Sequence, residues 1–155
     1  LQLDDKDATL LILGDASSRK DRDHKKTLLK LAKSNKNIIF LGWQEEVYKY
    51  INITNFFVAP ARGADPFPTT ILECMSLGVV CLVSDIGGQP EAVQNKELFF
   101  SPNDVDSLKN RLKILNNKSE NQIDKYSVFL KNRFIENFSI KHYKNKILFY
   151  FDSKL

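Results

Sequence analysis

The sequence is poor in the residues that mark small disulfide-bonded or membrane-spanning proteins. Of its 155 residues only two are cysteines, six are glycines and five are prolines. Two cysteines, Cys74 and Cys81, cannot form a disulfide framework, and two buried reduced thiols are a simpler interpretation of them than a single disulfide. No apolar run approaches the roughly 18 residues that a membrane span needs. Internal repeats, low-complexity tracts and Pro/Gly-rich linkers are also absent from the sequence.

The first six residues show neither the basic region nor the apolar region of a signal peptide. They also lack an initiator methionine, and we therefore expect the chain to begin inside a longer protein. With no signal peptide and no apolar span, the expected location is the cytoplasm. The two histidines, His24 and His142, are distant from each other and from the cysteines. This spacing does not fit a zinc site.

The charge of the chain is only mildly positive. Its 23 basic and 19 acidic residues are interspersed and leave a net charge of +4. Nucleic-acid-binding domains usually carry a basic stripe with stacking aromatics or a recognisable module, and the sequence shows neither, so we expect no nucleic-acid partner. A mild positive bias suits an anionic small molecule such as a nucleotide diphosphate, or a peripheral contact with a membrane surface.

Short apolar runs alternate with amphipathic stretches along the first two thirds of the chain. Each run is followed by a turn residue, as is typical of strands in a parallel sheet. Such strands, separated by single helices, predict a Rossmann-like α/β domain with helices on both faces of the sheet. The expected strands are residues 9–13, 38–41, 56–59, 79–83 and, more weakly, 98–100. The expected helices are residues 23–34, 45–52 and 68–77, and a short one opened by Pro90.

The last third of the sequence predicts helices only. Asp104 or Asp106 is placed to cap a helix with one apolar face. Residues 119–155 continue the helical pattern through two more helices that are rich in aromatic residues. Their apolar face either packs on the sheet throughout or, at its end, packs against a domain absent from this chain.

The segment from Pro60 to Met75 has the most informative chemistry. A strand ends at Pro60, a polar loop with Asp65 follows, and a helix begins at Pro68 or Thr69. The N-terminus of a helix offers unpaired N–H groups and a partial positive charge, which suit a phosphate. Seven residues separate Asp65 from Glu73, so that one carboxylate lies in the loop and one on the helix. A diphosphate flanked by hydroxyl-rich groups would fit this arrangement, as in a nucleotide sugar.

This segment resembles the retaining group 1 glycosyltransferases of the GT-B fold. Their signature is two glutamates with seven residues between them, followed by a small-residue turn and a strand. Residues 65–78 match it with one conservative change, Asp65 in place of the first glutamate. The Gly-Gly-x-Pro-Glu turn of the family is similar to residues 87–91, and the strand-to-glycine endings of the family are similar to those at Gly14 and Gly42. The resemblance spans residues 10–115, and it implies that residues 1–155 are the nucleotide-sugar-binding half of a GT-B enzyme whose N-terminal acceptor domain is absent.

The resemblance also implies roles for individual residues. Glu73 would accept hydrogen bonds from the ribose hydroxyls, and Asp65 would face the donor sugar, which makes these two the candidate catalytic residues. The backbone N–H groups of Phe67, Pro68, Thr69 and Thr70, as far as each has one, would hold the sugar and the distal phosphate. Gly42 and Trp43 would lie beside the base of the nucleotide. No metal or cofactor is expected, because fixed cations and helix dipoles would neutralise the leaving diphosphate.

Purely structural interpretations remain open for three of these residues. Glu73 could be a solvated helix residue, Asp65 a turn former before Pro66, and Trp43 a packing residue. The Arg and Lys pair with which the family grips the diphosphate has no counterpart before Leu10, and we expect it to precede Leu1.

The predicted function is therefore sugar transfer from a nucleotide sugar to a glycan or glycolipid, as in polysaccharide biosynthesis, with retention implied by the resemblance. The alternatives are a GT-B sugar phosphorylase or sucrose-type synthase, and a non-catalytic domain with a decayed donor site. The fragment alone is expected to be inactive.

Overall fold

The computed structural model describes residues 8–32 and 35–152, with the side chains of 150–152 left aside. The chain divides into two compact units, one ending at Val47 and the other beginning at Tyr48. Residues 33–34 of the helix predicted at 23–34 lie outside the described residues.

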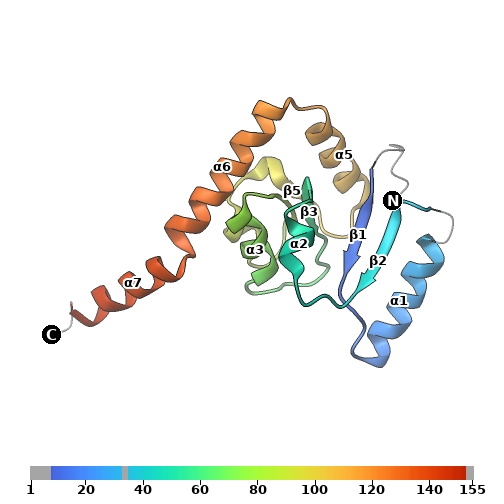
Figure 1. Cartoon of the computed structure of the whole chain (residues 1–155), viewed down its shortest axis with the longest axis horizontal. Coiled ribbons are helices and arrows are strands. Elements are labelled where there is room, and N and C mark those ends of the chain that lie inside the picture. The colour runs from blue at the N-terminus through green and yellow to red at the C-terminus, as the bar shows by residue number, and fades with distance from the viewer. Residues whose placement is uncertain (1–7, 33–34, 153–155) are drawn as a thin grey trace. The chain divides into compact units, whose positions relative to one another are not determined.

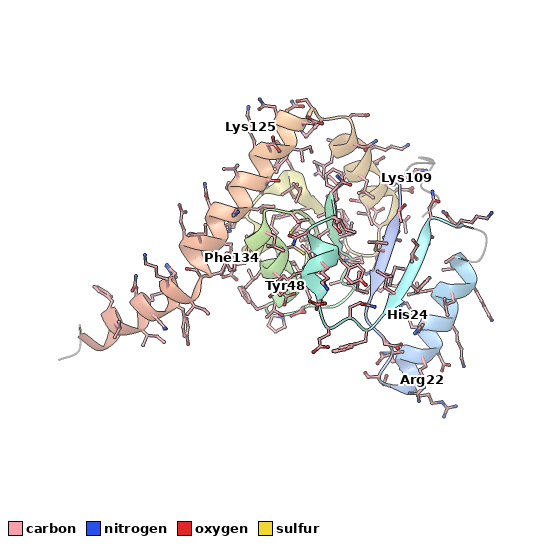
Figure 2. The ribbon with its side chains drawn as sticks, viewed as in Figure 1. Arg22, His24, Tyr48, Lys109, Lys125 and Phe134 are labelled. Atoms are coloured by element: carbon pink, nitrogen blue, oxygen red, sulfur yellow. The ribbon has the colours of Figure 1, made fainter. Side chains whose placement is uncertain are left out.

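The first unit contains two parallel strands and one helix (Figure 1). Strand β1 (Leu10–Leu13) pairs with β2 (Ile38–Gly42), and the register shifts between Ile12 and Leu13. Helix α1 (Arg19–Ala32) connects them and buries none of its residues. Arg22 and His24 are exposed on α1 (Figure 2). The connection is the βαβ unit that the sequence pattern predicts.

The second unit is built on a three-stranded parallel sheet. Its order is β3 (Phe56–Ala59), β4 (Val80–Ser84) and β5 (Phe99–Phe100). All five residues of β4 are buried, because this strand has a neighbour on each side and helices cover it. The continuous apolar run Val80–Val83 needs such a position, since a parallel strand in the middle of a sheet is shielded on both faces.

Helices surround this sheet at the points where the sequence changes from short apolar runs to helical spacing. They are α2 (Val47–Ile51), α3 (Thr69–Leu77), α4 (Gln89–Val93), the 3-10 turn η1 (Lys96–Leu98) and α5 (Val105–Asn116). Helix α3 ends at Gly78, whose φ of 77° is the left-handed conformation that glycine adopts without strain. Asp104 caps α5 by accepting the Ser107 N–H. Of the two caps predicted for this helix, Asp104 is therefore the correct one.

Two long helices complete the second unit. Helix α6 (Glu120–Asn137) begins with a capping box formed by Ser119 and Gln122 and packs along α3. Phe134 lies on the part of α6 beside α3 (Figure 2). Helix α7 (Ile140–Asp152) follows directly in the chain, shown in red in Figure 1. Arg133 of α6 donates to the carbonyls of Glu91 and Ala92 at the end of α4, so α6 is hydrogen-bonded to α4 as well as packed on α3.

The predicted α/β class with parallel strands is confirmed, and so is the Rossmann-like character, with helices on both sides of the parallel sheets. Two details differ from the expectation of strands buried on both faces of one sheet. The described strands form two hydrogen-bonded sheets, and only β4 is fully buried, whereas the residues of β1 and β3 are half-buried. A strand at the edge of a sheet has a partner on one side only, so full burial does not follow from an apolar run alone.

Candidate functional site

The N-terminus of α3 has no side-chain cap. Pro68 is at the N-cap position with extended backbone (φ −75°, ψ 109°), and no side chain accepts a hydrogen bond there. Proline has no side-chain oxygen, so it leaves open the N–H groups that a serine or aspartate would satisfy. Thr69 and Thr70, the first two residues of the helix, are exposed. The first turn of α3 therefore presents backbone donors and the positive end of the helix dipole to a ligand.

Glu73 lies one turn further along α3 and is half-buried. Its neighbours in α3, Ile71 and Cys74, are buried, so Glu73 stands at the margin of the core. Within residues 8–32 and 35–152, no ion pair includes Glu73. A half-buried carboxylate is costly to leave without partners, and a carboxylate of this kind is suited to accept hydrogen bonds from a bound ligand.

Asp65 is exposed in the loop that joins β3 to α3, residues 60–68, which we call the donor loop. Its Oδ1 accepts the backbone N–H of Phe67 at 3.0 Å, which is the Asx-turn geometry. Asp65 therefore shapes the loop, as its position before Pro66 allows. A carboxylate has about four acceptor sites, so this single bond leaves capacity for a ligand hydroxyl. The Phe67 N–H, in contrast, is already bonded and is not a free donor.

The turn between β4 and α4 packs against the backbone of the donor loop. The Gly88 N–H donates to the Asp65 carbonyl at 2.8 Å. A Cβ on Gly88 would lie 2.0 Å from the Pro66 carbonyl oxygen, and one on Gly87, whose φ is +64°, would lie 2.6 Å from the Asp65 carbonyl oxygen. Any side chain at either position would displace the loop. The sequence predicts a tight turn here but does not reveal that the turn touches the backbone of Asp65.

Buried polar groups fix the same turn. The side chain of Gln89 is buried, and its Oε1 accepts the Ser84 N–H at 3.1 Å. The Asp85 N–H donates to the Phe100 carbonyl, which ties the end of β4 to β5. The donor loop therefore rests on a turn that is held by the central sheet of the second unit. The Gly-Gly-Gln-Pro-Glu motif marks this turn in the sequence, but the burial of the Gln89 amide is seen only in the structure.

Aromatic packing holds the other end of the donor loop. The Phe67 ring lies 5.5 Å from the ring of Phe138, at an interplanar angle of 54°. The guanidinium of Arg133 lies 5.3 Å from the centre of the same Phe138 ring. Sequence reasoning missed both contacts, because Phe138 is 71 residues from Phe67 and only the general aromatic richness of residues 119–155 hints at such packing.

Gly42 and Trp43 belong to the first unit. Gly42 ends β2 with a φ of 67°, and its carbonyl accepts the Gly14 N–H at 2.8 Å, which holds the ends of β1 and β2 together. The Trp43 side chain is 72% exposed, so it does not serve as a core residue of this unit. Asp15, next to Gly14, forms an ion pair with Lys25 at 2.6 Å, and this hydrogen bond lowers the pKa of the Asp15 carboxyl.

The structure thus places Asp65, Phe67, Pro68, Thr69, Thr70 and Glu73 on one continuous loop and helix of the second unit, and Gly42 and Trp43 at one strand end of the first. In the described part of the chain, no group of three or more His, Cys, Asp or Glu side chains could hold a metal ion. The expectation that no metal is needed stays a prediction. No helix among the described residues is long and apolar enough to cross a membrane.

Comparison with known proteins gives consistent matches. The model of the family "Glycosyl transferases group 1" matches residues 1–129. The UDP-Gal:alpha-D-GlcNAc-diphosphoundecaprenol alpha-1,3-galactosyltransferase of Escherichia coli is 29% identical over 150 residues, which are 91% of this chain and 36% of that protein. The chain therefore spans little more than a third of the length of that relative.

Solved structures give the same fold. A glycosyltransferase from Rickettsia africae has a TM-score of 0.83 at 20% identity, over 95% of this chain and 40% of that one. Anabaena Alr3699/HepE, solved in complex with UDP, has a TM-score of 0.84 at 16% identity, over 94% of this chain and 41% of that one. At these identities the likeness shows the fold alone.

Proposed function

Because the chain belongs to the group 1 glycosyl transferases, we propose that it is the donor-binding domain of an enzyme that moves a sugar from a nucleotide sugar to a glycan or glycolipid. One observation carries the proposal: the uncapped N-terminus of α3 stands between two carboxylates, Asp65 in the donor loop and Glu73 in the helix. Amide donors at the centre and carboxylate acceptors on either side complement a diphosphate between a ribose and a sugar.

Each group has a distinct task in this proposal. The N–H groups of Thr69 and Thr70 bind the distal phosphate, because the Phe67 N–H is bonded to Asp65 and cannot contribute. Glu73 accepts hydrogen bonds from the two ribose hydroxyls, and Asp65 accepts one from a hydroxyl of the donor sugar. Gly42 and Trp43 of the first unit serve the base. The absence of an ion pair at Glu73 in the described residues supports a ligand as its partner.

The reaction breaks the bond between the anomeric carbon and the diphosphate oxygen and forms a bond from that carbon to the oxygen of an acceptor hydroxyl, with retention of configuration. The proton of that hydroxyl passes to the leaving diphosphate. Negative charge develops on the leaving diphosphate, and the dipole of α3 stabilises it without a metal. The Arg and Lys pair expected before Leu1 would add the remaining positive charge. No cofactor is needed, since the nucleotide sugar is itself the activated substrate.

The donor is proposed to be a uridine diphosphate sugar. The Escherichia coli relative is named for UDP-Gal as donor and for a lipid diphosphate as acceptor, and its similarity extends over 91% of this chain. A lipid-linked acceptor agrees with the mild positive charge of the chain. The full-length protein would then act in the cytoplasm, in peripheral contact with the membrane that carries the acceptor, and would contribute to polysaccharide synthesis.

An acceptor-binding domain is the proposed partner of this chain. The chain spans 36% to 41% of the proteins compared above, so most of such an enzyme lies outside it. Helix α7 exposes large apolar side chains, including Ile140, Tyr143, Leu148 and Phe149. Exposed apolar side chains that cluster on one helix often mark a surface that binds another protein or domain. We assign the surface of α7 to the acceptor domain of the same protein.

A thermal-shift panel of UDP, GDP, ADP and CDP on the full-length protein tests the proposed function. UDP at about 100 times its dissociation constant should stabilise the protein by roughly 2.7 kcal/mol, and the other nucleotides should stabilise it less. A site filled by inorganic phosphate in preference to any nucleotide would indicate a sugar phosphorylase. Stabilisation by none of these compounds would indicate a decayed donor site and would contradict the proposal.

A further inference from the structure

The donor loop is held at two points, one by the residue that ends helix α6 and one by the turn that precedes helix α4. At the first point, the Phe67 ring packs against Phe138, the residue that ends α6. At the second, the backbone of Asp65 and Pro66 rests on Gly87 and Gly88, which directly precede α4. Both contacts are made by groups that do not bind the donor in the proposed function: the Phe67 ring, and the backbone of Asp65 and Pro66.

Arg133 connects the two points. Its Nε donates to the Ala92 carbonyl at 2.7 Å and its Nη2 to the Glu91 carbonyl at 2.6 Å, both in the last turn of α4. The same guanidinium lies 5.3 Å from the centre of the Phe138 ring, which is the distance of a cation–π contact. One side chain therefore holds α4 by two hydrogen bonds and also makes a cation–π contact with the Phe138 ring.

The effect of this arrangement falls on Asp65. Its Oδ1 is bonded to the Phe67 N–H, and its carbonyl to the Gly88 N–H. Phe67 is fixed by Phe138, and Gly88 belongs to the helix that Arg133 holds. The orientation of the Asp65 carboxylate thus depends on both contacts. Glu73, in contrast, is placed by α3 itself, whose residues Ile71, Cys74 and Met75 are buried in the core.

We propose that Arg133 and Phe138 are positioning residues for the donor sugar, which fix the carboxylate of Asp65 through the Phe67 ring and the Gly87–Gly88 turn. The inference rests on the proposed function, since it assigns the sugar to Asp65. Arginine suits this position, because its guanidinium donates from Nε and Nη2 to two neighbouring carbonyls, whereas a lysine ammonium lacks this fixed fork of donors.

The experiment compares the full-length wild type with Phe138→Ala, Phe138→Tyr, Arg133→Lys and Phe129→Ala. Phe129→Ala is the matched control, because this phenylalanine is on the same helix and exposed. Two quantities are measured: the rate constant for release of UDP from UDP-galactose at saturation, and the dissociation constant of UDP. UDP release counts cleavage of the bond at the anomeric carbon whatever accepts the sugar.

Phe138→Ala and Arg133→Lys should lower the rate constant about 10- to 100-fold, which is the size of effect expected from a misplaced reacting group. The dissociation constant of UDP should change less than about threefold, because Glu73 and α3 keep their places. Phe138→Tyr, which retains an aromatic ring, should keep most of the wild-type rate constant. Phe129→Ala should match the wild type in both quantities. If α6 had only a structural role, the variants would lower the rate constant and weaken UDP binding to a similar extent.

Amide hydrogen exchange in the absence of ligand gives a second readout. The Phe67 and Gly88 amides should exchange faster in Phe138→Ala than in the wild type, while the amide of Leu82 in β4 should be unchanged. The inference would be overturned, and the proposed function left standing, by either of two results. One is an exchange rate of the Phe67 amide that is the same in Phe138→Ala and in the wild type. The other is a rate constant for UDP release that is the same in Phe138→Ala and in an active wild type. A wild type that neither binds UDP nor cleaves UDP-galactose would overturn the proposed function and the inference with it.

Discussion

The Asp65 side chain shapes the donor loop by accepting the Phe67 N–H, and in the proposed function it also contacts the donor sugar. Aspartate is one methylene shorter than the glutamate of the family signature, and a side chain of this length can close an Asx turn onto its own backbone. The change from Glu to Asp is therefore compatible with a loop that needs a local acceptor.

Substitution of Asp65 by Asn separates the two tasks. An asparagine side chain also accepts the Phe67 N–H and preserves the turn, but it lacks the charge that strengthens a bond to a sugar hydroxyl. We expect Asp65→Asn to lower turnover of UDP-galactose in the full-length protein far more than its affinity for UDP. Steady-state kinetics and calorimetry measure the two quantities. Equal losses in both would mean that Asp65 only shapes the loop.

The two cysteines are buried free thiols, as predicted. The hydrogen bond with Cys74, together with burial, raises the pKa of the Cys81 thiol. A raised pKa in the folded state means that folded protein keeps this proton when unfolded protein has lost it. The resulting stabilisation is complete below the ordinary thiol pKa of about 8.5 and is lost as pH rises toward the folded-state value.

We therefore expect the free energy of unfolding to fall more steeply above about pH 8.5 in the wild type than in Cys81→Ala. Urea denaturation from pH 7 to pH 10 checks this difference. A thiol reagent should label neither cysteine in the native protein and both in urea. Rapid labelling of Cys81 in the native state would contradict its burial and its raised pKa.

At the scale of the elements, contact between backbones determines how the donor loop and the β4–α4 turn fit together. Gly88 has an ordinary φ of −80°, so its requirement for glycine is a matter of space alone. A methyl group there would lie 2.0 Å from the Pro66 carbonyl oxygen. Backbone groups cannot rotate away as a flexible side chain can, and relief requires a shift of the whole loop.

Gly88→Ala should therefore lower the free energy of unfolding by about 1–3 kcal/mol, the usual cost of overpacking, and should lower turnover as well. Gly63→Ala is the matched control, since Gly63 lies in the same loop with nothing within 4 Å of the added methyl. Urea denaturation of both variants gives the comparison. If Gly88→Ala were as stable and active as Gly63→Ala, the loop would not rest on this turn.

Most elements follow from the sequence, because their causes are local. The run Val80–Val83 and the turn residues around it predict a buried parallel strand, and Pro68 and Gly78 mark the ends of α3. The donor motif could be located in the same way, since its residues are continuous in the chain. The uncapped N-terminus of α3 follows from Pro68 at the N-cap.

Other features could not be predicted, because they depend on residues far apart in the sequence. The packing of Phe138 on Phe67 and the bonds of Arg133 to α4 have no pattern of spacing. The bond from Phe67 to Asp65 also decides which amides remain free, and loop geometry of this kind is not encoded in residue type alone. The helix at 19–32 begins earlier than expected, since Ser18 and Asp21 exchange capping hydrogen bonds at its start.

At the scale of the whole molecule, the chain presents the donor-binding half of the proposed reaction. In that proposal it provides carboxylates and amide donors, and an acceptor-binding domain and an Arg and Lys pair are to be supplied by the rest of the full-length protein. The division of residues 1–155 into a donor domain with C-terminal helices from residue 119 stays a prediction. So do the location in the cytoplasm and the contact with a membrane.

Purified chain 1–155 should accordingly transfer no sugar. Incubation with radiolabelled UDP-galactose and a lipid diphosphate acceptor should give no labelled product, whereas the full-length protein should give one under the same conditions. Sugar transfer by the chain alone would contradict the division of tasks.

The proposed contact between α7 and the acceptor domain is also testable. Tyr143→Lys would place a charge in that contact and should lower the melting temperature of the full-length protein.

The central claim is that Glu73 binds the ribose of a nucleotide diphosphate. A carboxylate one turn into α3 mildly repels a phosphate at the helix N-terminus, so its presence there needs a compensating interaction. Two charge-assisted hydrogen bonds to ribose hydroxyls provide one. Loss of such bonds costs about 1.5–3 kcal/mol, or roughly 10- to 150-fold in affinity.

Titration calorimetry of UDP on the full-length wild type and on Glu73→Ala measures this most directly. Glu136→Ala, which removes an exposed carboxylate from α6, controls for the change in net charge. We predict that Glu73→Ala weakens UDP binding roughly 10- to 150-fold, that Glu136→Ala binds as the wild type does, and that the melting temperatures of the unliganded proteins agree within a few degrees. A loss of affinity below about threefold in Glu73→Ala would contradict the assignment of the donor site.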